Sequence, residues 1–408
     1  MFEEYVWPEA PDFQDPATTQ NLEHALRKML DYGKPYYVPK EQAWYIVRHE
    51  DIESVFRDKT TSSDRLSGYF GRLPPDKQAI LEPLFNDLKR WLIFVDEPDH
   101  KRVRSPMQRA FTSSIVKSWD DWLNTSSEKI ILKGIENGNF EIMQQLAQPL
   151  PLMLICEMLG MPEDDGMEIK GHYEAIGNFI DNSTNPAAAA EALKANVILN
   201  NYMQEKLSEA RNRADLNLLK VLANIQAENR DVSDQDLVVN GVLVLGAGHE
   251  TTSSHIASTI MMAYEDEELL ASIGDSPKVR QALIEESLRL YPPVIRTSRI
   301  IQREFNLSGV TIPKDQRCML MIASGNRDPE VFESPNQIRL DRKKNPHFAF
   351  ASGTHYCVGA NVARLEADIT LKHLGRLASD FRLSDEALEW TNNSTFRALK
   401  SLRLIRRS

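Results

Sequence analysis

The segment HFAFASGTHYCVGANVAR, residues 347–364, holds a single cysteine, Cys357, among aromatic residues, glycines and alanines. Only two other cysteines occur, Cys156 and Cys318, and all three lie far apart in the chain. This spacing excludes a disulfide framework and a CxxC metal site, and it favours a reducing compartment. We therefore expect Cys357 to act without a disulfide partner.

A second group of chemically capable residues is GAGHETT, residues 246–252, inside a long helical pattern. Two glycines and two threonines in a helix interior cost roughly 1 kcal/mol per glycine and a few tenths per threonine. The spacing alone favours a helix crossing that needs small residues, but a crossing does not require the carboxylate of Glu250. Small residues would let a flat group approach the backbone, while Glu250 and Thr251 could relay protons.

Two further pairs have helical spacing. Glu286 and Arg289 are three residues apart, and His100 and Arg104 are four apart, so each pair shares one helical face. Such a pair is usually an exposed ion pair that contributes little to stability. Each pair alone is weak support for a site.

The elements that must position these residues are mostly helices. Ser233 and Asp236 form a capping-box pattern that predicts a helix start, and the following residues are apolar nearly all round, as in a buried helix. The pattern continues to about residue 269. Residues 301–324 alternate around turns and predict a small antiparallel sheet. We expect one domain over residues 1–408, with β-rich pieces at about 35–60 and 295–325 and a helical body at about 75–290 and 358–376.

Composition narrows the function class. The chain has 408 residues, 42% hydrophobic and 26% charged, which is typical of a globular protein. Basic residues number 48 against 59 acidic ones, a net charge of −11, and no basic domain is present, which argues against a nucleic-acid role. The N-terminus lacks a signal-peptide pattern, and no apolar run reaches the ~20 residues of a membrane span. We expect a soluble, cytoplasmic protein without a membrane anchor.

Taken together, these segments resemble the cytochrome P450 superfamily of haem-thiolate monooxygenases over residues 40–405. The matching motifs are AGHETT (247–252), ESLR (286–289), the meander NRDPEVFESPNQIRLDR (326–342) and FASGTHYCVGANVAR (350–364), which fits F-x-x-G-x-H-x-C-x-G. The acidic chain is similar to the bacterial branch. The resemblance implies a mainly α fold with a minor antiparallel β part: a triangular helical prism with haem between the central long helix and the helix after the cysteine loop.

The resemblance also implies roles for individual residues. Cys357 would be the axial ligand of haem b (iron protoporphyrin IX), because a thiolate pushes electron density onto the iron. Glu250 and Thr251 would be catalytic. The residues implied to contact the cofactor are His100, Arg104, Ala247, Thr251, Arg299, His355, Cys357 and Gly359. Four of them, His100, Arg104, Arg299 and His355, would hold the propionates. Arg296 is an alternative to Arg299 in that role.

Other positions have structural roles in this interpretation. Glu286 and Arg289 would join their helix to the meander through Arg339 or Arg342, with Asn326–Arg327 as the competitor. Ala351 stands where the family usually has glycine, and costs about 1–2 kcal/mol if its φ must be positive. Cys156 and Cys318 would be core thiols, and His249 a supporting residue rather than a catalytic one.

The implied activity is oxidation, most simply hydroxylation, of a small and largely apolar substrate in secondary metabolism. The monomeric enzyme would activate O2 with electrons from NAD(P)H, delivered by ferredoxin reductase and a ferredoxin or flavodoxin. Peroxide-driven oxidation, ring coupling or desaturation is the alternative, and a haem-binding sensor without turnover is a distant one. A zinc site at His355 and Cys357 has too few ligands.

Two surfaces are expected from the same reasoning. Residues 63–94, 177–181 and 293–297 would form the substrate pocket, whose members Phe85, Leu92, Phe94, Ile295 and Arg296 suit an apolar ligand with one anionic or hydrogen-bonding group. An acidic redox partner would need a local basic patch. The candidates are Arg339, Arg342, Lys343 and Lys344 in the meander, and Lys101, Arg102 and Arg109; the best are Lys101, Arg102, Lys343 and Lys344.

Overall fold

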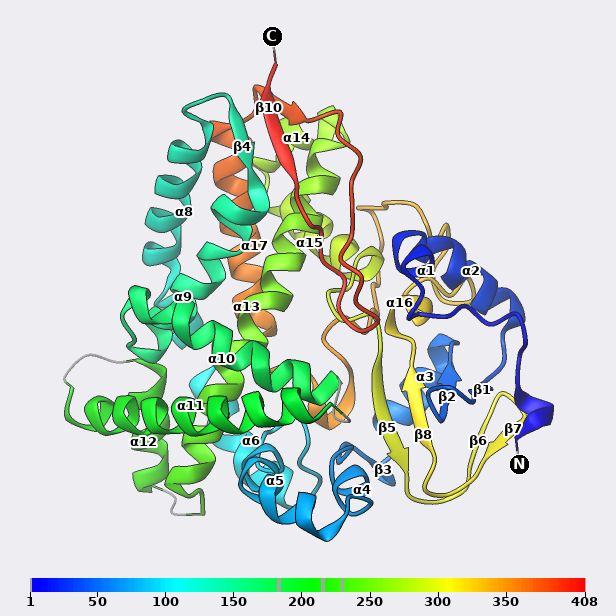
Figure 1. Cartoon of the computed structure of the whole chain (residues 1–408). Coiled ribbons are helices and arrows are strands. Elements are labelled where there is room, and N and C mark those ends of the chain that lie inside the picture. Colours follow the sequence, from blue (N-terminus) through cyan, green and yellow to red (C-terminus); the bar gives the residue numbers. More distant parts are fainter. Residues whose placement is uncertain (1, 182–184, 214–216, 229–230, 408) are drawn as a thin grey trace. The chain divides into compact units, whose positions relative to one another are not determined.

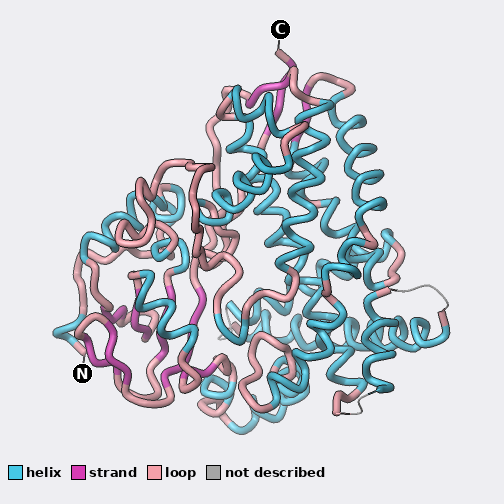
Figure 2. The backbone as a smooth tube through the Cα atoms, turned by 180° about the vertical axis from the view of Figure 1, so that it is seen from behind, coloured by secondary structure: helices cyan, strands magenta, loops and turns pink. Residues whose placement is uncertain are grey.

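The computed structural model describes residues 2–181, 185–213, 217–228 and 231–407, and its elements are mainly helices with small sheets (Figures 1 and 2). The chain divides into two compact units, Met1–Ser62 with Trp119–Leu150 and Thr251–Ser408, and Ser63–Ser118 with Pro151–Glu250. The mainly α fold class with a minor β part is confirmed. Residues 182–184, 214–216 and 229–230 of the expected helical body lie outside the described residues, and the single domain stays a prediction.

The first unit carries the strands and the C-terminal helices. Its helices are η1 (Glu3–Tyr5), α1 (Pro16–Gln20), α2 (Leu22–Tyr32), α3 (His49–Arg57), α8 (Asp120–Ile135), η2 (Met143–Ala147), α14 (Glu267–Ile273), α15 (Pro277–Leu290), α16 (Ile322–Gly325), η3 (Gly353–His355) and α17 (Ala360–Leu377). Its strands are β1 (Tyr36–Val38), β2 (Ala43–Ile46), β3 (Thr61–Ser62), β4 (Asn139–Glu141), β5 (Thr297–Ile301), β6 (Phe305–Leu307), β7 (Val310–Ile312), β8 (Arg317–Leu320), β9 (Phe381–Leu383) and β10 (Arg403–Arg406).

The main sheet has the order β1-β2-β8-β5-β3 (Figure 1). Alternate residues of β2 point to opposite faces, so Trp44 packs in one core cluster and Tyr45 in another. Both faces are therefore buried. The hairpin β6–β7 and the pair β5–β8 are antiparallel as predicted, but β2 pairs with β8 in parallel. A parallel partner more than 250 residues away leaves no turn signal in the sequence.

The third sheet, β4-β10-β9, contains the last two strands of the chain, β9 and β10. Strand β4 falls inside the segment predicted to be wholly helical, and it pairs with β10 from Phe140 to Leu404. Its strand conformation depends on that distant partner.

The second unit is helical. Its helices are α4 (Ser67–Phe70), α5 (Pro75–Leu88), α6 (Asp99–Ala110), α7 (Ser113–Lys117), most of α9 (Pro149–Leu159), α10 (Glu163–Asp181), α11 (Pro186–Asn212), α12 (Leu218–Glu228) and the first part of α13 (Asp234–Tyr264). None of the helices, within the residues described, is long and apolar enough to cross a bilayer.

Helix α13 contains the segment AGHETT (247–252), and its start is the predicted capping box. The Asp236 backbone N–H donates to Ser233 Oγ at 3.1 Å, and the Ser233 N–H donates to Asp236 Oδ2 at 2.9 Å. The helix ends at Tyr264, before the predicted end, because Asp266 caps a new helix by accepting from the Leu269 N–H. Helix α17 begins directly after the cysteine loop, as predicted.

Candidate active site

The cysteine loop holds its thiol at the beginning of α17. Cys357 is exposed, whereas Cys156 and Cys318 are buried. Burial raises the pKa of Cys156 to about 11 and that of Cys318 well above its usual range. The Cys357 N–H donates to the Phe350 carbonyl at 2.9 Å, which closes the loop. The prediction of two core thiols is confirmed, and Cys357 is the accessible one.

Two left-handed residues shape this loop. Ala351 has φ of 59° and Gly353 has φ of 71°. A Cβ on Gly353 would lie 2.6 Å from the carbonyl oxygen of Phe56, so no larger residue fits there. Ala351 therefore does occupy a position that favours glycine, at a cost of about 1 kcal/mol.

Arg299 and the cysteine loop lie against the same residue of α3. The Arg299 guanidinium lies 5.3 Å from the centre of the Phe56 ring, and the carbonyl of Phe56 contacts Gly353, the first residue of the turn that carries His355. Arg299 is buried, and His355 is half-buried. The first unit thus gathers a cation and an imidazole near the loop of Cys357.

Arg296, the competitor for the role of Arg299, is committed elsewhere. Its guanidinium donates to both carboxylate oxygens of Glu41 at 3.0 and 2.9 Å and to Ser394 Oγ at 2.6 Å. This core ion pair also removes the basis for an anionic substrate group beside Arg296. Ile295 is likewise a core residue, in the cluster that contains Phe13.

The Glu286–Arg289 pair is fully buried rather than exposed on the surface. The Arg289 guanidinium donates to both Glu286 oxygens at 2.8 Å. Glu286 also accepts from Arg342 Nε at 3.0 Å and from the backbone N–H of Arg339 at 2.9 Å. Arg289 donates to the carbonyl of Asn326 at 3.2 Å. The helix is therefore joined to the meander through Arg339, through Arg342 and through Asn326, so the alternatives named above occur together.

In the second unit, His100 and Arg104 lie on one buried face of α6. Burial lowers the pKa of His100, and the positive charge of Arg104 lowers it further despite a contact of 3.5 Å with Glu97. A neutral imidazole beside a guanidinium can donate hydrogen bonds to carboxylates. The predicted pairing on one face is confirmed, while contact with propionates stays a prediction.

The glycines of α13 serve helix crossings, as the spacing indicated. A Cβ on Gly246 would lie 1.7 Å from Cζ of Tyr173, and one on Gly248 would lie 2.8 Å from Cδ1 of Ile155. The helix nevertheless has an exposed stripe, formed by Ala247 and Glu250. Small-residue packing and an accessible carboxylate therefore coexist on the same helix.

The residues predicted to line the substrate pocket are largely packed against each other. Phe85 is buried and contacts Phe179 at a ring distance of 6.0 Å, which joins the segments 63–94 and 177–181. Leu92 and Phe94 are also buried. Sequence reasoning missed Tyr173, whose ring stacks on Trp91 at 6.0 Å. The helical spacing of Tyr173 resembles that of any core aromatic residue, so no signal distinguished it.

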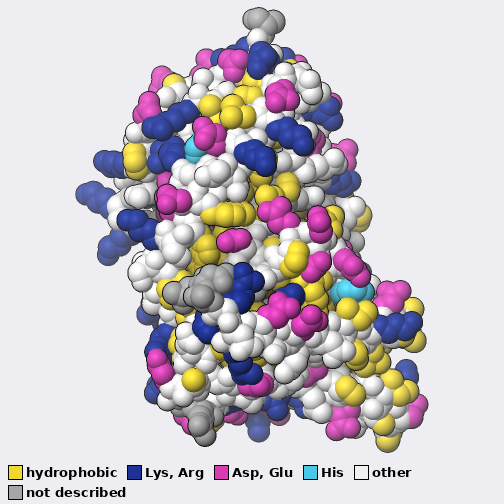
Figure 3. All heavy atoms as spheres, turned by 90° about the vertical axis from the view of Figure 1, so that its left-hand side faces the viewer, with side chains coloured by type: hydrophobic (Ala, Val, Ile, Leu, Met, Phe, Trp, Pro, Cys, Tyr) yellow, Lys and Arg dark blue, Asp and Glu magenta, His cyan; other side chains and the backbone are white. Residues whose placement is uncertain are grey.

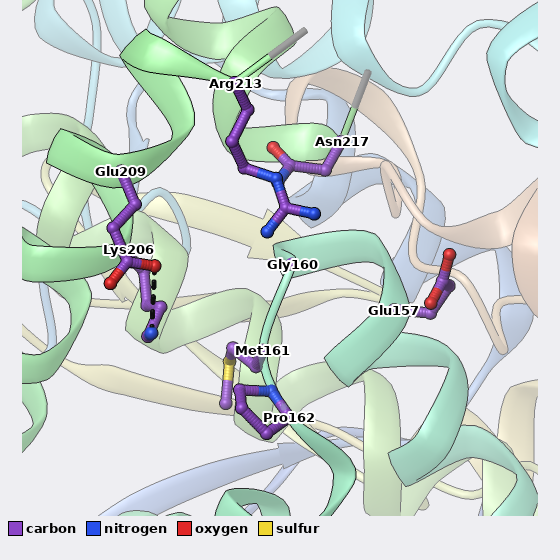
Figure 4. A pocket seen from close by; sticks show the side chains of 8 residues that line it. All are labelled: Glu157, Gly160, Met161, Pro162, Lys206, Glu209, Arg213 and Asn217. Carbon is purple, nitrogen blue, oxygen red and sulfur yellow. Dashed lines mark hydrogen bonds and ion pairs between the residues drawn. The ribbon is translucent and has the colours of Figure 1, made fainter. Parts of the chain in front are cut away.

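The second unit also has a surface pocket, and none of the predicted site residues lines it. It has a volume of about 330 Å³ and is lined by residues of both charges, including Glu157, Lys206, Glu209 and Arg213 (Figure 4). Figure 4 shows Lys206 and Glu209 paired, and their distance is 3.0 Å. Because the lining side chains carry both charges and do not point polar groups toward one place, the pocket does not indicate a particular ligand.

The basic residues predicted for docking divide into two groups. Arg102 was among the residues expected on an exposed docking surface, but it is half-buried and pairs with Asp236 at 2.6 Å and Asp99 at 3.1 Å. Arg109, Arg339 and Arg342 also form ion pairs. Lys101, Lys343 and Lys344 are exposed. On the face drawn in Figure 3, basic and acidic side chains are interspersed.

The donor set fits an iron porphyrin. Within the described residues, no three His, Cys, Asp or Glu side chains are grouped as metal ligands, so Cys357 is a lone donor. A porphyrin iron needs one such ligand, because the macrocycle supplies the others. Arg299 and His355 supply partners for carboxylates in the same unit.

The chain is similar to known proteins over nearly its whole length. The family model described as Cytochrome P450 matches residues 278–387. Cytochrome P450 CYP107DY1 of Priestia megaterium is 26% identical, over 97% of this chain and 98% of its own. Nocardicin C N-oxygenase of Nocardia uniformis is 28% identical, over 92% and 90%.

The same likeness holds at the level of structure. CYP109E1 from Bacillus megaterium in complex with testosterone is 25% identical and has a TM-score of 0.83, covering 97% of this chain and 100% of its own. The cysteine loop, the buried Glu286–Arg289 pair and these similarities lead to one conclusion. In sequence and in fold, the chain is similar to the cytochrome P450 family.

Proposed function

We propose that the chain is a monomeric, single-domain monooxygenase of secondary metabolism that hydroxylates a small, largely apolar substrate with O2. Electrons come from NAD(P)H through ferredoxin reductase and a ferredoxin or flavodoxin. The observation that carries the proposal is the accessible Cys357 thiol in a closed loop at the start of α17, with the other two thiols buried.

In this proposal Cys357 would hold the iron of haem b through its thiolate. When bound, the haem supplies oxygen activation, which thiolate donation favours. The remaining cofactor contacts fall to the chain's own donors and small residues: His100, Arg104, Arg299 and His355 hold the propionates, and Ala247, Thr251 and Gly359 lie against the macrocycle. A Cβ on Gly359 would lie 3.9 Å from Cys357 Sγ, so the small residue keeps that side of the sulfur open.

Glu250 and Thr251 deliver protons. Glu250 is exposed on a helix that is otherwise mostly buried, and Thr251 follows it half-buried. A carboxylate oxygen that exchanges protons with solvent and a hydroxyl that passes them on form the simplest relay these residue types allow. Oxidation driven by peroxide needs no such relay, so the pair favours O2 chemistry.

The substrate class rests on the apolar side chains of the second unit. Phe70, Phe85 and Phe179 form an aromatic cluster, with ring distances of 4.4 Å and 6.0 Å. One solved relative, CYP109E1 from Bacillus megaterium, was determined in complex with testosterone, which is largely apolar. We expect a ligand of comparable apolar character.

Thr251→Ala tests the function. The variant should keep its haem content and substrate affinity, yet divert most reducing equivalents to hydrogen peroxide. The measurement compares NADPH consumed with product and peroxide formed, using a ferredoxin pair. Unchanged coupling would favour ring coupling, desaturation or peroxide-driven oxidation, and the absence of substrate-dependent oxygen uptake by the wild type would favour a sensor.

A further inference from the structure

Tyr173 of α10 lies against the turn of α13 that precedes Glu250. A Cβ on Gly246 would lie 1.7, 1.9 and 2.0 Å from three ring atoms of Tyr173, so the ring occupies space that only glycine leaves. The ring also stacks on Trp91 at 6.0 Å and 11°, and Trp91 stacks on Phe94 at 6.2 Å and 7°. These contacts restrict the phenol to one position.

The Glu250 side chain lines the same small cavity as the Tyr173 ring. Gly246 and Glu250 are four residues apart and so lie on the same face of α13. Side chains in a helix lean toward its N-terminus, which directs Glu250 back over Gly246 and toward the end of the phenol. Tyr173, Gly246 and Glu250 line the same cavity, whose volume of about 10 Å³ admits at most one water molecule.

The other charged groups of this cavity are accounted for. Lys170 and Glu174 line it from α10 and pair with each other at 3.3 Å, and His249 lines it from α13. Burial raises the pKa of Tyr173, and the negative charge of Glu250 raises it further. The phenol therefore stays protonated at every working pH and can donate a hydrogen bond.

We propose that the Tyr173 hydroxyl donates a hydrogen bond to the Glu250 carboxylate, directly or through one water molecule, and so positions the acid of the proton relay. The inference rests on the relay function proposed above for Glu250. Tyr173 is a positioning residue, and no bond to it forms or breaks. Its ring, held by Gly246 and Trp91, limits the directions that the carboxylate can take.

A spectroscopic test asks whether the two groups interact. Chain labelled with [13Cζ]tyrosine is prepared as the reduced CO complex of the holoenzyme, which is diamagnetic. Tyr173→Phe removes one of the eleven tyrosine signals and so assigns it. Glu250→Gln should then shift that signal. The matched control is Tyr202, whose hydroxyl donates to Asp165 at 2.6 Å; its signal, assigned by Tyr202→Phe, should not move. An unmoved Tyr173 signal would overturn the proposal.

A kinetic test asks whether the contact serves the relay. Loss of a hydrogen bond to a charged group should raise peroxide formed per NADPH roughly tenfold in Tyr173→Phe. KM should change little. The acid limb of the plot of coupling against pH should move to higher pH, because the carboxylate loses a donor that favours its charged form. Tyr202→Phe should change none of these quantities.

The outcomes separate the two proposals. If Glu250→Gln remains fully coupled, the relay function fails, whatever the NMR result. If Glu250→Gln uncouples the reaction while Tyr173→Phe retains wild-type coupling and pH profile, the relay stands and the role of Tyr173 is overturned.

Discussion

At the scale of single residues, the three thiols differ in a way that can be tested. Cys357→Ala should abolish the thiolate-type Soret band of the reduced CO complex, because the other two thiols, both among the described residues, are buried. Cys156→Ala and Cys318→Ala should retain the band, although loss of buried atoms will lower their stability. Absorbance spectra of the three variants decide the matter, and a band lost with either core thiol would contradict the assignment.

Ala351 is a residue whose backbone conformation opposes its type. At φ of 59°, Ala351→Gly should relieve about 1–2 kcal/mol of strain, offset by the added freedom of glycine in the unfolded chain. The net gain in free energy of unfolding should be about 0.5–1 kcal/mol. Urea denaturation measures it. Ala349→Gly, two residues earlier and outside the left-handed region, should lower the stability instead, and a gain in both variants would refute the strain argument.

At the scale of elements, the capping box of α13 also anchors α5 and α6. Arg90 and Arg102 both donate to Asp236, which is buried. Burial alone would raise the pKa of Asp236, but the hydrogen bonds from Arg102, Ser233 and Arg90 outweigh it and lower the pKa to about 2. The start of the helix is therefore joined to two preceding segments of the same unit.

The lowered pKa of Asp236 predicts a pH-dependent stability. Because the folded value lies below the unfolded one, the stabilisation, roughly 2 kcal/mol, is present above about pH 4 and is lost as the pH falls toward 2. Asp236→Asn should be destabilised by that amount near neutral pH, and the difference from wild type should shrink in acid. Glu228→Gln, which removes the exposed pair with Arg109, is the control and should cost under about 1 kcal/mol at any pH. A pH-independent difference for Asp236→Asn would exclude this origin.

The crossing of α10 and α13 makes the effect of an alanine depend on Tyr173. In an open helix, Gly246→Ala would gain about 1 kcal/mol of propensity. Here the new Cβ would collide with the Tyr173 ring, so overpacking should cost about 1–3 kcal/mol. In a Tyr173→Ala background the sign should reverse, and Gly246→Ala should stabilise. Denaturation of the four proteins in this cycle provides the test, and equal effects in both backgrounds would disprove the contact.

At the scale of the whole molecule, charge limits how an acidic redox partner binds. The net charge of −11 repels such a partner at long range, so a local group of lysines must attract it. With Arg102, Arg339 and Arg342 held in ion pairs, the meander lysines Lys343 and Lys344 are the better candidates, and Lys101 is an independent one.

Charge reversal tests this surface. Lys343→Glu with Lys344→Glu should lower the first electron transfer from a ferredoxin roughly threefold to tenfold at low salt and flatten its salt dependence. The CO spectrum and substrate binding should be unchanged. Lys314→Glu, an exposed lysine in the turn between β7 and β8, is the control. If the double variant transfers electrons at the wild-type rate while Lys101→Glu transfers them slowly, the partner docks at α6 instead.

The candidate site residues could be predicted from the sequence, because they lie in short contiguous motifs. Cys357 with its glycine-rich loop, Glu250 with Thr251, and Glu286 with Arg289 are each readable within one turn or one helix. Helices α13 and α17 were predictable as well, since capping residues and apolar periodicity are local properties. The sequence also indicated that Ala351 occupies a position where glycine is usual, and its φ of 59° agrees with this.

Only the tertiary structure decided which distant residues meet. Arg296 and Arg299 are alike in the sequence, yet Glu41, in the turn between β1 and β2, pairs with Arg296, while Arg299 lies over Phe56. The parallel pairing of β2 with β8, the strand β4 and the ion pairs of Arg102 likewise depend on partners far along the chain. Tyr173 is the clearest case: its ring meets Gly246 because two helices cross there, and periodicity identifies a buried face without identifying what covers it.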